Sequence, residues 1–294
     1  MQDNTTNATP STSPGTIVDP LTRITLVIGA PGKTGRRVVE RLRSAGMPVR
    51  EASRSSEVEF DWERPSTWGP AFDGIRAAYI TYYPDLALPG AADAVGELAD
   101  IALSRGVRRL VLLAGRGEEG ARKAELRLQE TDADWTIVRC GFFAQNFSEM
   151  FADPIRHGAL AMPEGSGADP FLDIDDVADV VVAALQDDRH AGKLYELTGP
   201  RVVSLDDVAS TLTDAIGRSV THVQLNRAEY AAELAAAGIA DEVAAHITDV
   251  IVDALDGRNA WTTDDIELVL GRPARDFTEF ARDAVTAGAW DLPD

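Results

Sequence analysis

The stretch Ile24-Thr25-Leu26-Val27-Ile28-Gly29-Ala30-Pro31-Gly32-Lys33-Thr34-Gly35 decides the fold of this 294-residue chain. Its first five residues are apolar or β-branched, which predicts a short buried strand that ends at Gly29. A helix is expected over residues 36–45, because Val38, Val39 and Leu42 share one helical face and Gly46 follows as a cap. A glycine-rich loop directly between a strand and a helix is typical of phosphate-binding turns.

Each glycine of this loop has a separate physical role. Gly29 makes the tight turn, Gly32 lets the backbone approach a pyrophosphate, and Gly35 lets the helix and strand pack closely. The helix N-terminus adds free N–H groups and a partial positive charge. The loop therefore predicts a dinucleotide site, with a plain tight turn as the alternative. The candidate cofactor-binding residues are Gly29, Pro31, Gly32, Lys33, Thr34 and Gly35.

Strands and helices alternate along the chain after this loop. Further strands are predicted at 49–53, 77–82, 109–113 and 135–139, and helices are predicted at 90–104 and 118–129. Such alternation implies right-handed crossovers between parallel strands. The sequence therefore predicts an α/β fold with a doubly wound, Rossmann-like parallel sheet.

The pattern is less regular after about residue 141. Helices are predicted at 204–216, 227–237, 241–255 and 276–287, which indicates a smaller, mainly helical substrate lobe beside the carboxyl edge of the sheet. Residues 1–20 are rich in Thr, Ser, Asn and Pro and are expected to be a disordered tail. The expected domains are a dinucleotide-binding core at 21–150 and a mixed region at 151–294, which completes the sheet and forms the lobe.

Composition excludes several classes of protein. The net charge of 28 basic minus 48 acidic residues, −20, disfavours binding to nucleic acids and anionic membranes. One cysteine and four scattered histidines form no disulfide and no zinc-binding cluster, so no metal site is expected. No apolar run approaches the roughly 18 residues that span a bilayer. We therefore expect a soluble, cytoplasmic protein.

The end of the second strand bears on the choice between the two nicotinamide dinucleotides. An NAD site typically has a carboxylate here, which accepts a hydrogen bond from the ribose 2′-hydroxyl. This chain has Ser53, Arg54 and Ser55 instead, although Glu51 is close. The planar guanidinium of Arg54 suits a 2′-phosphate. NADP(H) is therefore favoured over NAD(H), with a solvated surface arginine as the alternative.

Taken together, these segments resemble the NmrA-like group of atypical short-chain dehydrogenases, over nearly all of the chain from residue 22 onward. That group includes quinone, azo-dye and triphenylmethane reductases, ergot-alkaloid dehydrogenases, and redox-sensing regulators that bind the dinucleotide without turning it over. The motifs that carry the resemblance are the glycine loop, the arginine after the second strand, Phe60-Asp61-Trp62, residues 108–117, Trp135-Thr136-Ile137-Val138-Arg139, Phe142-Phe143-Ala144-Gln145-Asn146-Phe147, residues 171–178 and residues 195–200.

The resemblance implies further site residues. It implies that Asp61 lies near the adenine and that Thr81, Tyr82 and Tyr83 line the ribose and nicotinamide side. It also implies that Ala114 and Gly115 lie beneath the nicotinamide. The residues that it places around the substrate pocket are Cys140, Gly141, Phe142 and Phe143. For the phenylalanines, core packing is an equal alternative.

The Tyr-x-x-x-Lys pair of classical short-chain dehydrogenases is absent, and Ala114 occupies the usual position of the serine. This favours acceptors that take hydride with little acid assistance, such as quinones, iminium ions, azo groups and conjugated cations. If a proton donor exists, the resemblance implies Lys123 as the first candidate, and Tyr83 and Tyr82 come next because phenols at the carboxyl end of a strand can reach a ligand. Lys123 lies on a charged helical face, so a solvated side chain is the alternative. Cys140 has no activating histidine nearby in the sequence and is expected to be a small packing residue.

Two functions are consistent with these features. The first is an NADPH-dependent oxidoreductase that transfers hydride to a small conjugated or aromatic acceptor. The second is a non-catalytic NAD(P)-sensing regulator that binds a partner protein, as the missing catalytic triad suggests. The expected partner is a small-molecule acceptor, and a homodimer stays open.

Overall fold

The computed structural model describes residues 24–292, so the predicted tail at 1–20 lies outside the described residues. A seven-stranded sheet in the order β3-β2-β1-β4-β5-β6-β8 forms the centre, and every neighbouring pair is parallel. This confirms the predicted doubly wound α/β fold. The strands are β1 (Ile24–Ile28), β2 (Val49–Ser53), β3 (Val58–Glu59), β4 (Ile75–Ile80), β5 (Arg109–Gly115), β6 (Asp134–Cys140) and β8 (Lys193–Leu197).

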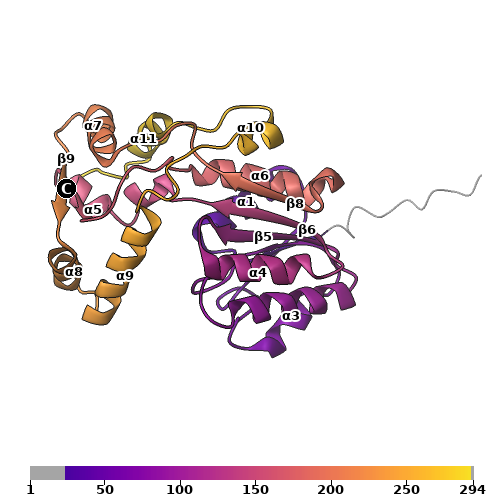
Figure 1. Cartoon of the computed structure of the whole chain (residues 1–294). Helices are drawn as coiled ribbons and strands as arrows, with labels where there is room; N and C mark the ends of the chain where they lie inside the picture. The colour runs from indigo at the N-terminus through magenta and orange to yellow at the C-terminus, as the bar shows by residue number, and fades with distance from the viewer. Residues whose placement is uncertain (1–23, 293–294) are drawn as a thin grey trace, which may run out of the picture.

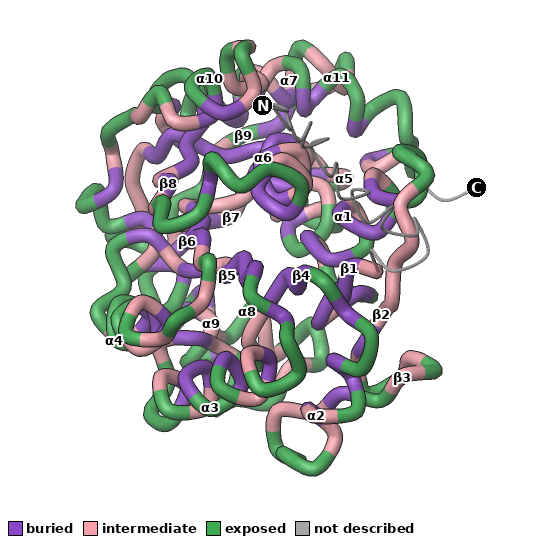
Figure 2. Tube along the Cα trace, turned by 90° about the vertical axis from the view of Figure 1, so that its right-hand side faces the viewer, coloured by how far each residue is buried: buried purple, intermediate pink, exposed green. Residues whose placement is uncertain are grey.

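Helices cover both faces of this sheet, as Figure 1 shows. Helices α1 (Lys33–Ser44) and α6 (Ile174–Gln186) pack together on one face, and α3 (Ala91–Ser104) and α4 (Glu119–Gln129) pack together on the other, near the short α2 (Trp68–Ala71). Each face has its own apolar core. The central strands are buried between these layers, whereas the outward sides of the helices are exposed (Figure 2). Parallel sheets need such cover on both faces.

Two predicted boundaries differ from the structure near the glycine loop. Helix α1 begins at Lys33 rather than at residue 36, because Gly32 is its N-cap and the end of the loop is already helical. Strand β4 is shifted toward the N-terminus relative to the predicted 77–82 and ends at Ile80. Thr81 leaves the strand, since its carbonyl oxygen accepts a hydrogen bond from the indole of Trp62 at 3.0 Å.

The chain after β6 forms a second layer of structure around its own apolar core. The predicted helices at 204–216, 227–237, 241–255 and 276–287 are present within one or two residues, and a capping box between Ser204 and Asp207 begins the first of them. They are α7 (Leu205–Ile216), α8 (Arg227–Ala236), α9 (Asp241–Ala254) and α11 (Phe277–Thr286), with the shorter α5 (Ala152–Arg156) and α10 (Asp265–Leu270).

This lobe also contains strands that the sequence did not predict. Strands β7 (Ala159–Pro163) and β9 (Thr221–Leu225) form a two-stranded parallel sheet. Every residue of β9 is exposed or only half-buried, so the strand lacks the apolar run that marks a core strand. Three short 3-10 turns complete the secondary structure of residues 24–292, at Pro65–Thr67, Ala144–Phe147 and Asp188–His190.

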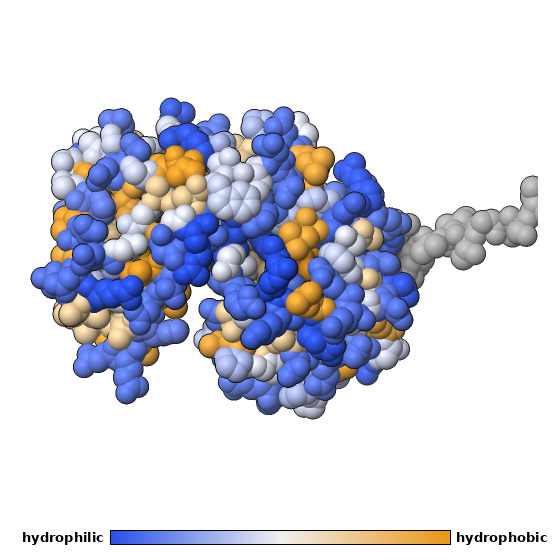
Figure 3. All heavy atoms as spheres, in the orientation of Figure 1, coloured by the Kyte–Doolittle hydropathy of each residue, from blue (hydrophilic) through white to orange (hydrophobic). Residues whose placement is uncertain are grey.

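The lobe lies beside the carboxyl edge of the main sheet. The chain leaves the end of β6 directly into the lobe core through Phe142 and Phe147, and it returns through α6 and β8 to complete the sheet. Figure 3 shows an indentation of the surface between the lobe that carries α8 and α9 and the sheet domain that carries α3 and α4. Open α/β sheets bind ligands outside the carboxyl ends of their strands, so a ligand site is expected at this edge.

Candidate functional site at the carboxyl edge of the sheet

The glycine loop has the compact geometry that a dinucleotide site requires. Gly29 has a φ of +76°, and the Gly32 N–H donates to the Gly29 carbonyl oxygen at 2.9 Å, which closes the turn. A Cβ on Gly35 would lie 2.2 Å from that same oxygen, and a Cβ on Gly29 would lie 2.1 Å from Thr81 Oγ1. No side chain caps α1. The open helix N-terminus and the three glycines of the loop therefore fit a pyrophosphate.

Basic side chains at the start of α1 reach across to the lobe. Lys33 Nζ donates to Asn146 Oδ1 at 2.7 Å and lies 3.2 Å from Glu149 Oε2, while Arg36 Nη2 donates to Glu149 Oε1 at 2.7 Å. Partial burial favours protonation of Glu149, but the two basic partners outweigh it and hold the pKa of this carboxyl below its usual value. Asn146 and Glu149 are site residues that sequence reasoning missed as contacts of the loop.

Arg54 and Tyr83 form a pair at the ends of β2 and β4. The guanidinium carbon of Arg54 lies 4.6 Å from the centroid of the Tyr83 ring, and Tyr83 is 60% exposed. Asp61 is nearby, where a hydrogen bond from the Glu63 N–H and a pair with Arg64 lower the pKa of its carboxyl. Within residues 24–292, Arg54 forms no direct ion pair with an acid, although its charge helps to lower the pKa of Asp61, so it can still meet an anionic ligand.

Thr81 and Tyr82 are both held by the surrounding structure. The Thr81 hydroxyl donates to the Ile28 carbonyl oxygen at 3.0 Å, which ties the end of β4 to the end of β1. Tyr82 packs against Trp62 with ring centroids 4.6 Å apart, and burial raises the pKa of its phenol. Tyr82 is thus part of an aromatic wall, whereas Tyr83 projects outward.

The ends of β5 and β6 bring Ala114, Gly115 and Cys140 together. Gly115 and Cys140 are paired in register, and Ala114 and Cys140 are buried. Burial raises the pKa of the Cys140 thiol, which agrees with a packing role. Beside them, the carboxyl group of Glu118 lies on the backbone of Gly115, where a Cβ would be 2.0 Å from Glu118 Oε2. No sequence signal pointed to Glu118.

Arg116 and Asp169 are further buried charged residues at this edge that the sequence did not reveal. Arg116 donates to the carbonyl oxygens of Asn259 and Trp261 at 2.9 Å each, and its guanidinium lies 3.9 Å from the Trp261 ring centroid. Arg116 thereby fixes the loop after α9 against the end of β5. Trp261 is 48% exposed, so its ring presents a flat apolar surface at the same edge.

The Asp169 side chain is buried without full hydrogen bonding. Asp169 is 2% exposed, and its Oδ2 atom has no hydrogen-bond partner among the described residues. It lies beside the end of β6, because a Cβ on Gly141 would be 3.4 Å from this oxygen. Burial raises the pKa of Asp169 to about 7, although Arg116 and a hydrogen bond from the Phe142 backbone act in the opposite direction.

The remaining predicted residues lie in different surroundings. Phe142 packs with Phe147, Phe151 and Phe171 at the edge of the lobe core, while Phe143 packs against the core shared by α1 and α6. Both are half-buried, so each combines a packing role with some exposed surface. Lys123 is exposed on α4. The structure thus places most of the predicted residues at one edge of the sheet, but their side chains differ in how far they are exposed there.

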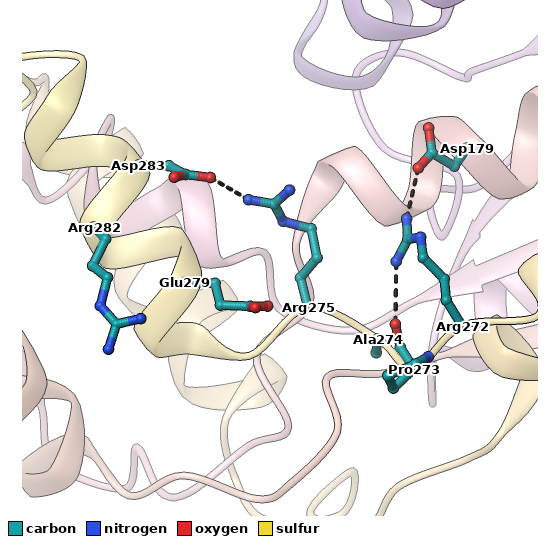
Figure 4. Close-up of a pocket in the computed structure, with 8 residues that line it drawn as sticks. All are labelled: Asp179, Arg272, Pro273, Ala274, Arg275, Glu279, Arg282 and Asp283. Atoms are coloured by element: carbon teal, nitrogen blue, oxygen red, sulfur yellow. Dashed lines mark hydrogen bonds and ion pairs between the residues drawn. The ribbon is translucent and has the colours of Figure 1, made fainter.

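A surface pocket of about 670 Å³ lies elsewhere, against α6 and the start of α11 (Figure 4). Arg272 pairs with Asp179 at 2.6 Å, and Arg275 pairs with Asp173 at 3.0 Å and with Asp283. Most of the charges that line this pocket are therefore paired, and the network connects α6 with the start of α11. The candidate cofactor site lies at the strand edge and not here.

Two further features concern metal binding and membranes in residues 24–292. In this part of the chain, no group of three or more His, Cys, Asp or Glu side chains is arranged to hold a metal ion. Among the same residues, no helix has both the length and the apolar character needed to cross a membrane.

Comparison with known proteins shows which family this chain resembles. The model of the NmrA-like family matches residues 124–279. The chain is 30% identical to an NAD(P)H azoreductase of Xenophilus azovorans, over 87% of this chain and 96% of the relative. It is 32% identical to an agroclavine dehydrogenase of Claviceps fusiformis, over 88% and 96% respectively.

A solved structure shares the fold at lower identity. The Citrobacter sp. triphenylmethane reductase complexed with NADP(H) superimposes with a TM-score of 0.74 at 20% identity, covering 88% of this chain and 99% of that one. The family match spans more than half of the chain, and the two enzymes above align over almost their full length. The chain belongs to the NmrA-like family.

Proposed function

We propose that the protein is an NADPH-dependent reductase that transfers hydride to a small conjugated or aromatic acceptor. Membership of the NmrA-like family and the similarity to an NAD(P)H azoreductase and an agroclavine dehydrogenase support the general class of NAD(P)H oxidoreductase. The observation that carries the proposal is the glycine loop, which leaves an uncapped helix N-terminus at the carboxyl edge of β1. The nicotinamide supplies the hydride when bound.

Two parts of the dinucleotide are assigned to residues of this chain in this proposal. The loop from Gly29 to Gly35 would hold the pyrophosphate, and Arg54 would hold the 2′-phosphate. Ser53 replaces the carboxylate that an NAD site typically has at the end of β2. Glu51 does not take that role, because it pairs with Arg43 on α1. These features support NADP(H) over NAD(H).

The acceptor would lie where β4, β5 and β6 end. The side chains exposed or half-exposed around this part of the edge are largely aromatic, which suits a flat conjugated molecule. They are Tyr82, Phe142, Phe143 and Trp261. Ala114 stands where a classical short-chain dehydrogenase has its serine, so alcohols and simple ketones are poor candidates. Quinones, azo compounds, imines and conjugated cations fit better.

The test combines binding and turnover. Purified protein is titrated with NADPH, NADP+, NADH and NAD+, and NADPH oxidation is then followed with a panel of quinones, azo dyes and a triphenylmethane dye. We expect tighter binding of NADPH than of NADH and turnover of at least one acceptor. Tight binding without any turnover would favour the sensing regulator instead. Failure to bind any dinucleotide would overturn the interpretation of the glycine loop.

A further inference from the structure

Glu118 occupies an unusual position at the end of β5. It is the N-cap residue of α4, yet its side chain makes no capping hydrogen bond. Its carboxyl group turns onto the backbone of Gly115, at 2.0 Å from the position that a Cβ would take. Throughout the described part of the chain, this carboxyl group has no ion pair and no hydrogen-bond partner. A carboxyl group in the space directly beyond a central strand is therefore free to meet a ligand.

The charges around Glu118 are negative. The loop between β4 and α3 packs on the start of α4, since a Cβ on Gly120 would lie 2.1 Å from the Ala87 carbonyl oxygen. Asp85 belongs to that loop and acts on Glu118. Lys123 is exposed further along α4 and forms no ion pair within residues 24–292. Although Glu118 as a residue is exposed, the loss of water around its inward-turned carboxyl group raises the pKa to about 7, and Asp85 adds to this effect.

The other unpartnered carboxyl group at this edge is not an alternative. Asp169 is 2% exposed and lies beneath the backbone of Gly141. The ring of Tyr82 packs on Trp62. The ring of Tyr83 stacks on Arg54 and therefore lies beside the end of β2, away from the ends of β5 and β6. Among residues 24–292, Glu118 is thus an accessible acid next to the paired ends of β5 and β6, where Gly115 and Cys140 are in register.

We propose that Glu118 is the proton donor of this enzyme and takes the place of the missing catalytic tyrosine. This inference rests on the proposed reductase function. When a quinone is reduced, the acceptor gains a hydride, and a new O–H bond forms as the O–H bond of the Glu118 carboxylic acid breaks. The resulting carboxylate regains its proton from water. A conjugated carbocation, in contrast, becomes neutral by taking hydride alone and needs no proton.

This difference between acceptors gives a direct kinetic test. Glu118→Gln keeps the shape of the side chain but has no acidic proton, and Glu119→Gln is the matched control on the exposed first turn of α4. The probes are menadione, a neutral quinone, and malachite green, a triphenylmethane cation. We expect Glu118→Gln to lower kcat with menadione about 100-fold, which is at the lower end of general acid catalysis. Malachite green reduction should fall by less than about threefold, which is small on the same scale.

A second measurement does not depend on turnover. Protein labelled with ¹³C at the glutamate carboxyl carbon is titrated by NMR, without any dinucleotide. Wild type and Glu119→Gln should each show a carboxyl resonance with a midpoint near pH 7, and Glu118→Gln should lack it. A midpoint for Glu118 near 4.3, the ordinary value for glutamate, would overturn the proposal.

The kinetic outcomes separate the two levels of inference. An equal loss with both acceptors would assign Glu118 to binding and overturn proton donation. Unchanged menadione reduction in Glu118→Gln would also overturn it, while the reductase function stands. If wild-type protein binds NADPH but reduces neither probe nor any other acceptor of the panel, both the reductase function and the role of Glu118 are wrong.

Discussion

The guanidinium carbon of Arg54 lies 4.6 Å from the centroid of the Tyr83 ring, and this pair joins the end of β2 to the end of β4. The stacking holds the side chain beside the strand edge without neutralising its charge. Among the described residues, Arg54 forms no direct ion pair with an acid, so its guanidinium can still bind an anion. The sequence prediction of NADP(H) depends on Arg54, and the contact with Tyr83 is what holds this side chain in place.

Replacing Arg54 with alanine should weaken the binding of NADPH much more than the binding of NADH. A charged hydrogen bond to phosphate contributes about 1.5–3 kcal/mol, so the dissociation constant for NADPH should rise roughly 10- to 100-fold. Arg43→Ala is the control, because Arg43 is also an exposed arginine near β2 but pairs with Glu51. Calorimetric titration of both dinucleotides measures the difference. Equal losses for NADPH and NADH would contradict the 2′-phosphate assignment.

Glu149→Gln should strengthen the binding of NADPH and NADH alike. In the present structure, Glu149 neutralises Lys33 and Arg36 at the start of α1, where a pyrophosphate would otherwise attract them. An ion pair of this kind contributes about 1 kcal/mol, which the dinucleotide must overcome to bind the same basic groups. Without the Glu149 carboxylate, both dinucleotides should therefore bind roughly fivefold more tightly. Asp153→Asn, which removes the exposed partner of Arg156 in the lobe, should have no effect. Weaker binding in Glu149→Gln would show that the contact between loop and lobe matters more than the freed charges.

Gly35→Ala should destabilise the fold and abolish dinucleotide binding. The added methyl group would lie 2.2 Å from the Gly29 carbonyl oxygen and 2.9 Å from the Ala30 Cα, and both are backbone atoms. Overpacking of this kind costs about 1–3 kcal/mol, and here we expect the upper end. At Gly46, with a φ of +70° and no atom within 4 Å, alanine should cost only about 1 kcal/mol. Urea denaturation compares the two variants, and equal losses of stability would contradict the close packing of the loop.

The stability of Asp169→Asn should differ from that of wild type in a pH-dependent way. Burial raises the pKa of Asp169 to about 7, so the folded protein holds this proton more tightly than the unfolded chain does. The protonated Asp169 therefore stabilises the wild-type fold fully below the pKa of an aspartate in the unfolded chain, and this stabilisation is lost as the pH rises through 7. Asparagine does not ionise, so the variant should gain about 2–3 kcal/mol relative to wild type between pH 5 and pH 8. Thermal unfolding across this range measures the gain, and a constant difference would refute it.

The core of the fold could be predicted because its signals are local. The run Ile24–Ile28, the glycine loop and the apolar faces of α1, α3 and α7 are periodic patterns within single segments. Strands β7 and β9 escaped prediction because they pair only with each other and most of β9 is exposed. Each of the two strands depends on a partner about sixty residues away in the chain, as in the pair Ala159 and Thr221.

The candidate site divides in the same way. Sequence by itself determined the strand, loop and helix that would hold a dinucleotide, and the absence of the tyrosine and serine of classical relatives, because these depend on residue type and spacing. Only the tertiary structure decided which charges meet. It brings Glu149 to Lys33, turns the Glu118 carboxyl group onto Gly115, and buries Asp169 with no partner for Oδ2 in the described part of the chain. The physical reason is that desolvation and charge pairing depend on contacts between distant segments, which no local pattern records.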